Sequence, residues 1–298
     1  MKSYTTLRNL FGKLTKNTAT ANLTQGDEWI NDEYRHMCAL KDFAFLHKAR
    51  TTTTTASTQF VNLPYGIDQV ESLYVTVSSQ RYTPKLITSR EQWDLLNQTT
   101  YTSDFAKYAF IFNGQVGIWP TPATSSNVIT VNGKIRVRDL NIADITSSTI
   151  TTLANGGTAL TVSAGLTTQM VGFWIRPTFS TTANTGDGEW YEIASVSSAT
   201  AGVISSAYGG VSIAVGTAAC TIAQMPLLPE AFHDTPAFKA AATYWYTEGD
   251  TKRGDAFMKK YTADITDLET DYTAFITDPV VDDGGEFAMI NPNLTISL

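Results

Sequence analysis

The sequence has few charged residues, few cysteines and histidines, and no long apolar run. Charged residues make up 16% of the 298 positions, below the usual quarter. No stretch approaches 18 uninterrupted apolar residues, which excludes a membrane-spanning helix, and the start resembles no signal peptide. The net charge of −7 argues against a surface that grips nucleic acid, because such a surface needs a basic patch. We therefore expect a soluble protein made in a cytoplasm.

The two cysteines and three histidines form no recognisable site. Cys38 and Cys220 lie far apart and their spacing gives no reason to expect a disulfide, and Cys38 falls on the apolar side of a predicted helix. His36, His47 and His233 have no companion at ligand or triad spacing. The chain also lacks a Gly-rich phosphate loop, a nucleophile elbow and a paired Cys or His metal motif. We expect no enzyme activity, no catalytic residue, no cofactor and no metal.

Two groups in the middle of the chain are weaker candidates for binding. The acidic group consists of Asp187, Glu189 and Glu192. Carboxylates suit hard cations, but a solvated loop is the more ordinary interpretation. The aromatic group consists of Trp174, Trp190 and Tyr191. It is a candidate for stacking on a sugar, although tryptophans more often lie in cores or interfaces.

The sequence predicts two helices joined by a short turn near its end. Thr235 is suited to an N-cap, Pro236 to the first helical position and Gly249 to termination. The second helix carries apolar residues at helical spacing: Phe257, Tyr261, Ile265, Leu268, Tyr272 and Phe275. Pro279 ends it, because the residue before a proline is disfavoured in the helical region.

Two further helices are predicted at the start of the chain. The first spans residues 3 to about 15, and a polar linker follows over 16–22. The second begins at a capping box formed by Thr24 and Asp27. Isolated helices of this length are marginal in water, so we expect both to pack on the C-terminal helices. That pairing joins the two ends of the chain.

Strands are predicted between the helices. The threonine run 51–55 predicts an extended connector entering a strand, and strands are expected at 59–63, 70–77 and 81–88. Ser89 caps a short helix, and Asn113-Gly114 predicts a tight hairpin between apolar strands. A second Asn-Gly pair, at Asn132, is compatible with another hairpin or with one long strand carrying a bulge.

The composition shifts to Thr, Ser, Ala, Gly and Val between residues 144 and 223. Six short strands are predicted there, which suggests a small sandwich or barrel: 149–153, 160–162, 171–176, 190–196, 203–205 and 211–222. We interpret this region as an inserted β domain. The predicted fold class is α+β, with a helical bundle from the N- and C-terminal helices, a β-sheet part and the inserted all-β domain. The predicted domains are a discontinuous core (1–143 and 224–278), the insertion (144–223) and a C-terminal extension (279–298).

The C-terminal extension begins with an acidic joint, Asp282 to Gly285, and then becomes apolar. Its apolar residues are Phe287, Met289, Ile290, Leu294, Ile296 and Leu298. An apolar terminal segment must be covered by its own body or by a partner. The flexible joint favours a partner.

The order of short motifs resembles the head-to-tail adaptor proteins of tailed bacteriophages. The motifs that carry the resemblance are WINDEYR (29–35), DFAFL (42–46), VNLPYGI (61–67), SREQW (89–93), GIWPTP (117–122) and LPEAFHD (228–234). The resemblance covers residues 1–141 and 225–278. These motifs concern packing and turns, not catalysis.

The resemblance implies a structural virion protein of the neck region, assembled in the host cytoplasm. Its implied form is a ring of twelve copies beneath the portal that extends the DNA channel and offers a platform for tail or nozzle proteins. DNA would pass through the lumen without specific binding, and no membrane is implied. The C-terminal extension would reach the portal, which makes its six apolar residues candidate portal-binding residues. The alternative function is binding of a carbohydrate or host surface by the inserted β domain.

Overall fold

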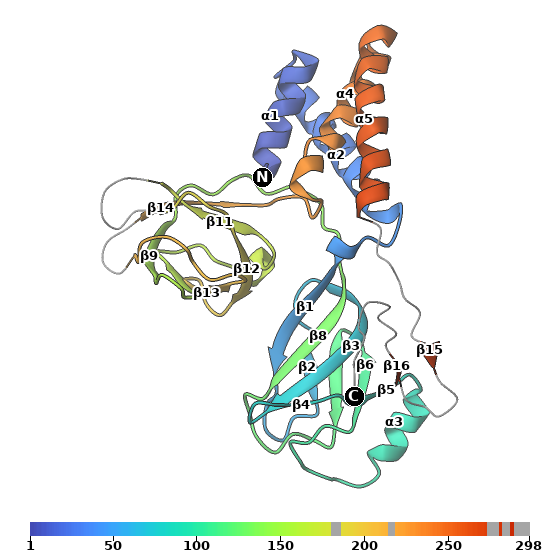
Figure 1. Ribbon diagram of the computed structural model, residues 1–298, viewed down its shortest axis with the longest axis vertical. Coiled ribbons are helices and arrows are strands. Elements are labelled where there is room, and N and C mark those ends of the chain that lie inside the picture. Colours follow the sequence, from blue (N-terminus) through green and yellow to red (C-terminus); the bar gives the residue numbers. More distant parts are fainter. Residues whose placement is uncertain (180–185, 214–217, 273–279, 282–286, 289–298) are drawn as a thin grey trace, which may run out of the picture.

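The protein has a mixed α+β fold with three visibly distinct parts (Figure 1). The computed structural model describes residues 1–179, 186–213, 218–272, 280–281 and 287–288. Helices from both ends of the chain lie together at the top of the view, two sheets lie below them, and a six-stranded barrel lies to one side. The predicted α+β class is confirmed. Among the described helices, none is long and apolar enough to cross a membrane.

The helical part consists of four long helices: α1 (Tyr4–Thr15), α2 (Thr20–Ala39), α4 (Thr235–Thr247) and α5 (Thr251–Asp271). Helix α4 contacts each of the other three. Its small residues Ala237, Ala240 and Ala241 are buried against Phe11 of α1 and Ile30 of α2. Because alanine leaves room for a neighbouring backbone, α4 can lie at the centre of this group. The expected pairing of N- and C-terminal helices is present.

Two predicted helix starts are wrong. Helix α4 begins at Thr235 itself, with Asp234 in the cap position, and the Thr235 hydroxyl instead donates to Asp264 Oδ2 of α5 at 2.8 Å. Helix α2 begins at Thr20, within the predicted linker, so Thr24 lies inside the helix and its hydroxyl donates to the Thr20 carbonyl. The Thr235 hydroxyl is thus taken by a neighbouring helix, whereas the Thr24 hydroxyl bonds a carbonyl one turn earlier in its own helix. Ser3, Ser89 and Asp250 do accept from backbone N–H groups of the first turns that they precede.

Helices α1 and α2 approach closely at Gly26. A Cβ atom added there would lie 2.3 Å from Cε1 of Phe11. The Phe11 ring is completely buried, so it has no open space to move into. The absence of a side chain at Gly26 therefore permits this contact.

Replacing Gly26 by alanine is expected to destabilise the fold by about 1–3 kcal/mol, because overpacking outweighs the better helix propensity of alanine. The matched control is Gly254→Ala, where the added Cβ would meet the Tyr246 ring at 2.5 Å. Tyr246 is 41% exposed and can swing away. Urea unfolding should place the control within about 1 kcal/mol of the parent protein. Equal losses for both variants would contradict this account of Gly26.

The sheet part holds two four-stranded sheets around a shared core. The first has the order β1 (His47–Thr53), β8 (Val128–Ile135), β3 (Ile67–Val77) and β4 (Gln80–Tyr82). The second has the order β2 (Phe60–Asn62), β7 (Gln115–Trp119), β6 (Tyr108–Phe112) and β5 (Lys85–Ile87). Val75 and Ile129 of the first sheet belong to the same buried cluster as Ala109 and Val116 of the second. Helix α3 (Arg90–Leu96) adds Trp93, which is buried and stacks on Phe110 at 5.4 Å between ring centroids.

The two Asn-Gly pairs have different roles. Asn113 and Gly114 both have positive φ, 49° and 71°, and form the predicted hairpin turn between β6 and β7. Asn132 and Gly133 lie inside the single strand β8, so the long strand with a bulge is the correct alternative. The bulges are in the partner strand β3, and a Cβ at Gly133 would lie 2.0 Å from the Gln69 carbonyl oxygen. Gly133 therefore admits a close approach of backbone, not a turn.

Six strands of the middle region close into a barrel in the order β10-β13-β12-β11-β14-β9. Their bounds are β9 (Thr149–Leu153), β10 (Ala159–Val162), β11 (Trp174–Pro177), β12 (Tyr191–Val196), β13 (Ala201–Ile204) and β14 (Ala218–Ala223). All six overlap the predicted strands. Their inward side chains form one buried cluster that includes Ile150, Leu160, Ile175, Ile193 and Ile222.

Short elements complete the described chain. They are the 3₁₀ turns η1 (Ala44–Leu46), η2 (Thr168–Met170) and η3 (Glu230–Phe232), and the antiparallel pair β15 (Val280–Val281) and β16 (Phe287–Ala288).

Candidate functional site

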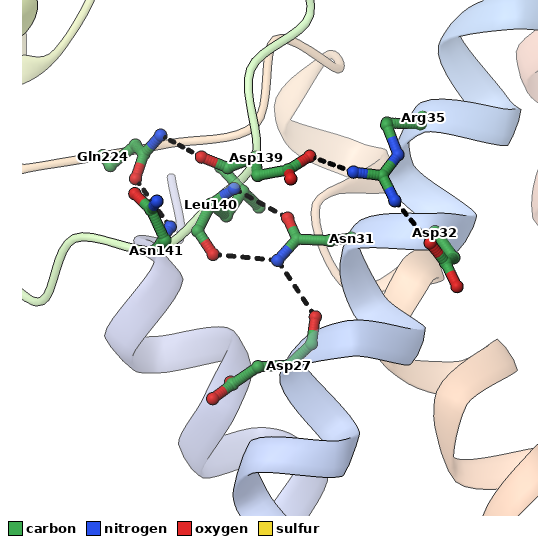
Figure 2. A network of polar contacts seen from close by, with 8 residues as sticks. All are labelled: Asp27, Asn31, Asp32, Arg35, Asp139, Leu140, Asn141 and Gln224. Atoms are coloured by element: carbon green, nitrogen blue, oxygen red, sulfur yellow. Dashed lines mark hydrogen bonds and ion pairs between the residues drawn. The ribbon is translucent and has the colours of Figure 1, made fainter.

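The three parts of the molecule meet at a junction crossed by two connectors. The first connector, residues 136–144, leads from β8 to the barrel, and the second, residues 224–229, leads from the barrel back to the helices. Hydrogen bonds tie the first connector to α2 and the two connectors to each other (Figure 2). In the second connector, the Leu227 N–H also donates to the Tyr34 hydroxyl of α2. This junction decides how the barrel is held relative to the rest of the subunit.

Asn31 of α2 forms the centre of the junction. Its side-chain oxygen accepts from the Leu140 N–H at 2.7 Å, and its amide nitrogen donates to the carbonyls of Leu140 and Asp27, each at 3.0 Å (Figure 2). Asn31 and Leu140 are both buried. A single side chain thus satisfies both backbone groups of Leu140 away from water.

Gln224 bridges the two connectors. Its Nε2 donates to the Asp139 carbonyl at 2.6 Å, and its Oε1 accepts from the N–H groups of Asn141 and Ile142 at 2.9 and 3.0 Å. Its backbone carbonyl accepts from the Tyr4 N–H of α1 at 2.8 Å. Arg35 of α2 adds ion pairs to Asp139 and Asp32 (Figure 2). Because Gln224 is buried, these bonds hold the connectors against each other and against α1.

Replacing Asn31 by leucine is expected to lower the free energy of unfolding by about 2–4 kcal/mol. Leucine preserves most of the volume but leaves the buried N–H and C=O of Leu140 without partners, and each orphaned group is costly. The control is Asn141→Ala on the same connector, since the Asn141 side chain is exposed and only its backbone N–H bonds Gln224. Chemical denaturation should show a change below about 0.5 kcal/mol for the control. A small effect of Asn31→Leu would remove Asn31 from the centre of the junction.

The N-terminal segment is tied to the end of the second connector by His233. The Lys2 N–H donates to Nδ1 at 3.0 Å, and Nε2–H donates to the Leu228 carbonyl at 2.9 Å in the tautomer that fits both contacts. His233 is buried, and burial lowers the pKa of its imidazole. The ring is therefore held in its neutral form. The first connector reaches the same segment, because Ser3 Oγ donates to Asp144 Oδ2 at 2.8 Å.

Mild acid is expected to weaken the fold through His233. Since the folded-state pKa lies below the ordinary 6.5, the unfolded chain binds a proton that the folded chain does not. The stability that neutral His233 contributes is fully present above pH 6.5. It is lost as the pH falls from 6.5 toward the lower pKa that His233 has in the folded state. Unfolding curves at pH 7.5, 6.5 and 5.5 should show a steeper loss for the parent protein than for His233→Gln, which cannot titrate. Parallel losses would exclude His233 as a source of the pH dependence.

A buried ion-pair group joins the sheet part to the barrel. Glu192 of β12 accepts from Lys48 Nζ at 2.8 Å and from Arg50 Nη2 at 2.5 Å, both on β1. Burial by itself would raise the pKa of Glu192, but the two cations outweigh it and the pKa lies below its usual value. Arg138 of the first connector donates to the barrel carbonyls of Gln169 and Val171 at 2.7 and 2.6 Å. Removing one partner from such a buried pair is strongly unfavourable, so these contacts hold the barrel against β1.

The predicted acidic group is not assembled as a metal site within the described residues. Glu192 is occupied by the two cations of β1, whereas Asp187 accepts from the Tyr191 hydroxyl at 2.5 Å. Within the described residues, no group of three His, Cys, Asp or Glu side chains is placed to hold a metal ion. Tyr191 is buried in the barrel and Trp190 lies against Arg176, while sugar binding by the aromatic group stays a prediction.

The remaining candidate residues have individual places. His36 is exposed beside Glu33, and His47 lies between Asp42 and Glu71. Cys38 and Cys220 are free and buried, and burial raises the pKa of both thiols, to about 12 for Cys38 and about 11 for Cys220.

The candidate portal-binding residues lie at the end of the chain. Phe287 belongs to the short strand β16. Met289, Ile290, Leu294, Ile296 and Leu298 lie outside the described residues, as does Phe275 of the predicted last helix.

The junction residues were not predicted as functional. Asn31 and Gln224 are polar residues whose importance depends on partners more than 80 positions away. The one local signal is at Asn31, because it stands three and seven positions before the buried Tyr34 and Cys38 on the inner face of α2. A polar residue on an apolar helix face indicates a buried hydrogen-bond partner.

Comparison with known proteins agrees with the resemblance of the short motifs to phage adaptor proteins. The family model described as SU10 adaptor protein matches residues 2–155, just over half of the chain. The matched region contains α1, α2, both sheets and the first barrel strand. No curated protein matches the sequence.

Proposed function

Because the chain belongs to the SU10 adaptor protein family, we propose that it forms a dodecameric ring beneath the portal, where it extends the DNA channel and carries the tail. As a member of this family, the chain is a structural adaptor of a bacteriophage and a component of the virion. The single observation that carries the proposal is the family match across α1, α2 and both sheets.

The packing of the helices supports the role of a ring subunit. The two ends of the chain fold against each other, with Lys2 and Tyr4 bonded to residues 233 and 224. We propose that the four long helices act as one bundle, and that residues 1–143 with 224–278 form the adaptor core. A ring of identical subunits needs heterologous contacts, in which one face of a subunit meets a different face of the next. A core whose N-terminal segment is held against residues 224 and 233 is suited to repeating such contacts.

The charge of the chain supports passive passage of DNA. With 28 acidic and 21 basic residues, the subunit carries a net charge of −7. Binding to DNA grows with the number of phosphates that basic side chains neutralise. A lumen built from an acidic protein would let DNA pass without adhesion.

The proposal assigns separate tasks to the barrel and to the end of the chain. We propose that residues 144–223 are an inserted domain that faces tail or nozzle proteins. Residues 279–298 would extend to the portal, with Phe287, Met289, Ile290, Leu294, Ile296 and Leu298 as the apolar contacts. The family is one of structural proteins, and we assign no catalytic residue to the chain.

A mass measurement tests the proposed ring. Purified protein is mixed with the portal protein of the same phage, and the complex is measured by native mass spectrometry and viewed by electron microscopy. The expected result is a portal ring that carries a second ring of twelve adaptor copies. A portal whose mass is unchanged by excess adaptor would refute the proposal.

A further inference from the structure

A cleft of about 820 Å³ lies at the junction, between the sheet part and the barrel. Its lining includes Arg35 of α2, Tyr65 of the loop before β3, Arg136 and Arg138 of the first connector, and Phe173 of the barrel. All three parts of the subunit therefore contribute to it. Its volume is within the range of ordinary binding pockets.

The cleft has an excess of positive charge. Arg136 is exposed and has no carboxylate partner within the described chain. Among the described residues, Arg138 donates only to backbone carbonyls and lies over the rings of Tyr65 and Phe173, and no acid there neutralises its charge. The carboxylate at the rim, Asp139, is already bound to Arg35.

A buried arginine extends this charge inward. A smaller cavity of about 30 Å³ shares Tyr65, Arg136 and Arg138 with the cleft and is also lined by Arg50. The Arg50 side chain is 10% exposed, and its Nε has no hydrogen-bond partner. Its one acidic neighbour, Glu192, is shared with Lys48. In a chain of net charge −7, this concentration of cations indicates a surface for an acidic partner.

The opposite imbalance occurs at the C-terminal end of α5. Asp267 and Asp271 are exposed there, and in the described part of the chain neither has a cationic partner. The last turn of α5 contains no basic residue. Acidic side chains at this end oppose the helix dipole, whose negative pole lies there. Their placement costs stability in the isolated subunit, which a cation from outside would offset.

The two unmatched surfaces belong to different elements, the first connector and the last turns of α5. Figure 1 shows α5 on the side of the helical part away from the barrel, whereas the cleft borders the barrel. A heterologous ring contact joins two different, complementary surfaces of neighbouring copies. We propose that the cleft of one copy, through Arg136 and Arg138, binds the acidic end of α5 of the next copy. This contact deepens the proposed function and depends on the ring.

Charge reversal on each side tests the contact in the full-length chain assembled on its portal. Arg136→Glu, and separately the double change Asp267→Lys with Asp271→Lys, should each reduce ring assembly at least about tenfold. Combining all three changes should restore assembly to within a few-fold of the parent protein. Lys107→Glu is the matched control and should leave assembly unchanged. Lys107 is exposed and directly precedes β6. Gly114, which borders the cleft, lies at the opposite end of β6, so Lys107 is remote from the cleft.

Thermal unfolding of the free subunits provides an independent readout. The double change on α5 should preserve or raise the melting temperature, because lysines favour a helix C-terminus, while it weakens assembly. Normal ring assembly by both Arg136→Glu and the double change on α5 would overturn the contact but not the ring. Failure of the combined variant to recover assembly would do the same. Loss of DNA binding upon Arg136→Glu, with unchanged assembly, would assign the cleft to nucleic acid and also overturn it. Failure of the parent protein to form a ring would refute the ring and this contact together.

Discussion

Excision of residues 145–222, with the ends joined by a short Gly/Ser linker, should leave a protein that still unfolds cooperatively. The two ends are already adjacent. The Ile145 N–H donates to the Ile222 carbonyl at 2.8 Å, and the Ile222 N–H donates to the Ile145 carbonyl at 2.9 Å. Such a reciprocal pair places two Cα atoms about 5.5 Å apart, which a few residues span easily.

The packing of the barrel also favours its independence. Its buried cluster is distinct from the clusters of the helices and of the sheets. Excision removes Glu192 from Lys48 and Arg50, but it also returns these cations to water, so no buried unpaired charge remains. We expect the melting temperature to fall by less than about 10 °C.

Circular dichroism and thermal unfolding measure this outcome. The control is the full-length variant Glu192→Gln, which keeps the barrel but weakens its ion pairs with β1. Because that variant leaves two cations buried against a neutral group, it should lose more stability than the excised protein does. A broad, non-cooperative transition in the excised protein would show that residues 144–223 are not a separable insertion.

Removal of residues 283–298 should leave a folded subunit that no longer docks on the portal. Within the described residues, the four hydrophobic clusters are built from residues up to Tyr272, and we expect them to form without this segment. If the apolar residues of the extension carry the contact, binding should weaken at least about a hundredfold, as expected when several interface anchors are lost together.

Cosedimentation with portal rings measures the loss, and unfolding curves check that the fold is unchanged. A control for chain length keeps the extension but replaces Leu294, Ile296 and Leu298 by serine, and it should dock as poorly as the truncated chain. Unchanged docking by the truncated chain would remove the extension from the portal contact. Loss upon truncation but not upon serine substitution would move the contact to the remaining residues of the segment.

Local pattern alone predicted most of the elements. The periodic apolar residues of α5, from Phe257 to Leu268, predicted a helix because a helix buries one stripe of its surface. The Asn113-Gly114 hairpin was predictable because few residues other than Asn and Gly adopt positive φ readily. The six barrel strands were predictable from alternation and turn residues, which act within a few positions of each other.

Other features depended on groups that are distant in the sequence. Asn132-Gly133 has the local composition of a turn, yet the strand continues because β1 and β3 pair with β8 on both sides. Thr235 has the composition of a cap, yet Asp264 of the neighbouring helix accepts its hydroxyl. In each case a tertiary partner outcompeted the local preference.

The sequence by itself determined the kind of most elements and indicated the pairing of the two chain ends and the family, because these follow from periodicity and short motifs. Only the tertiary structure decided the junction at Asn31 and Gln224, the Glu192 ion pairs and the excess of cations in the cleft. These features join residues from opposite parts of the chain, and the energy of a buried polar group depends on which partner the fold brings to it. No local pattern contains that information.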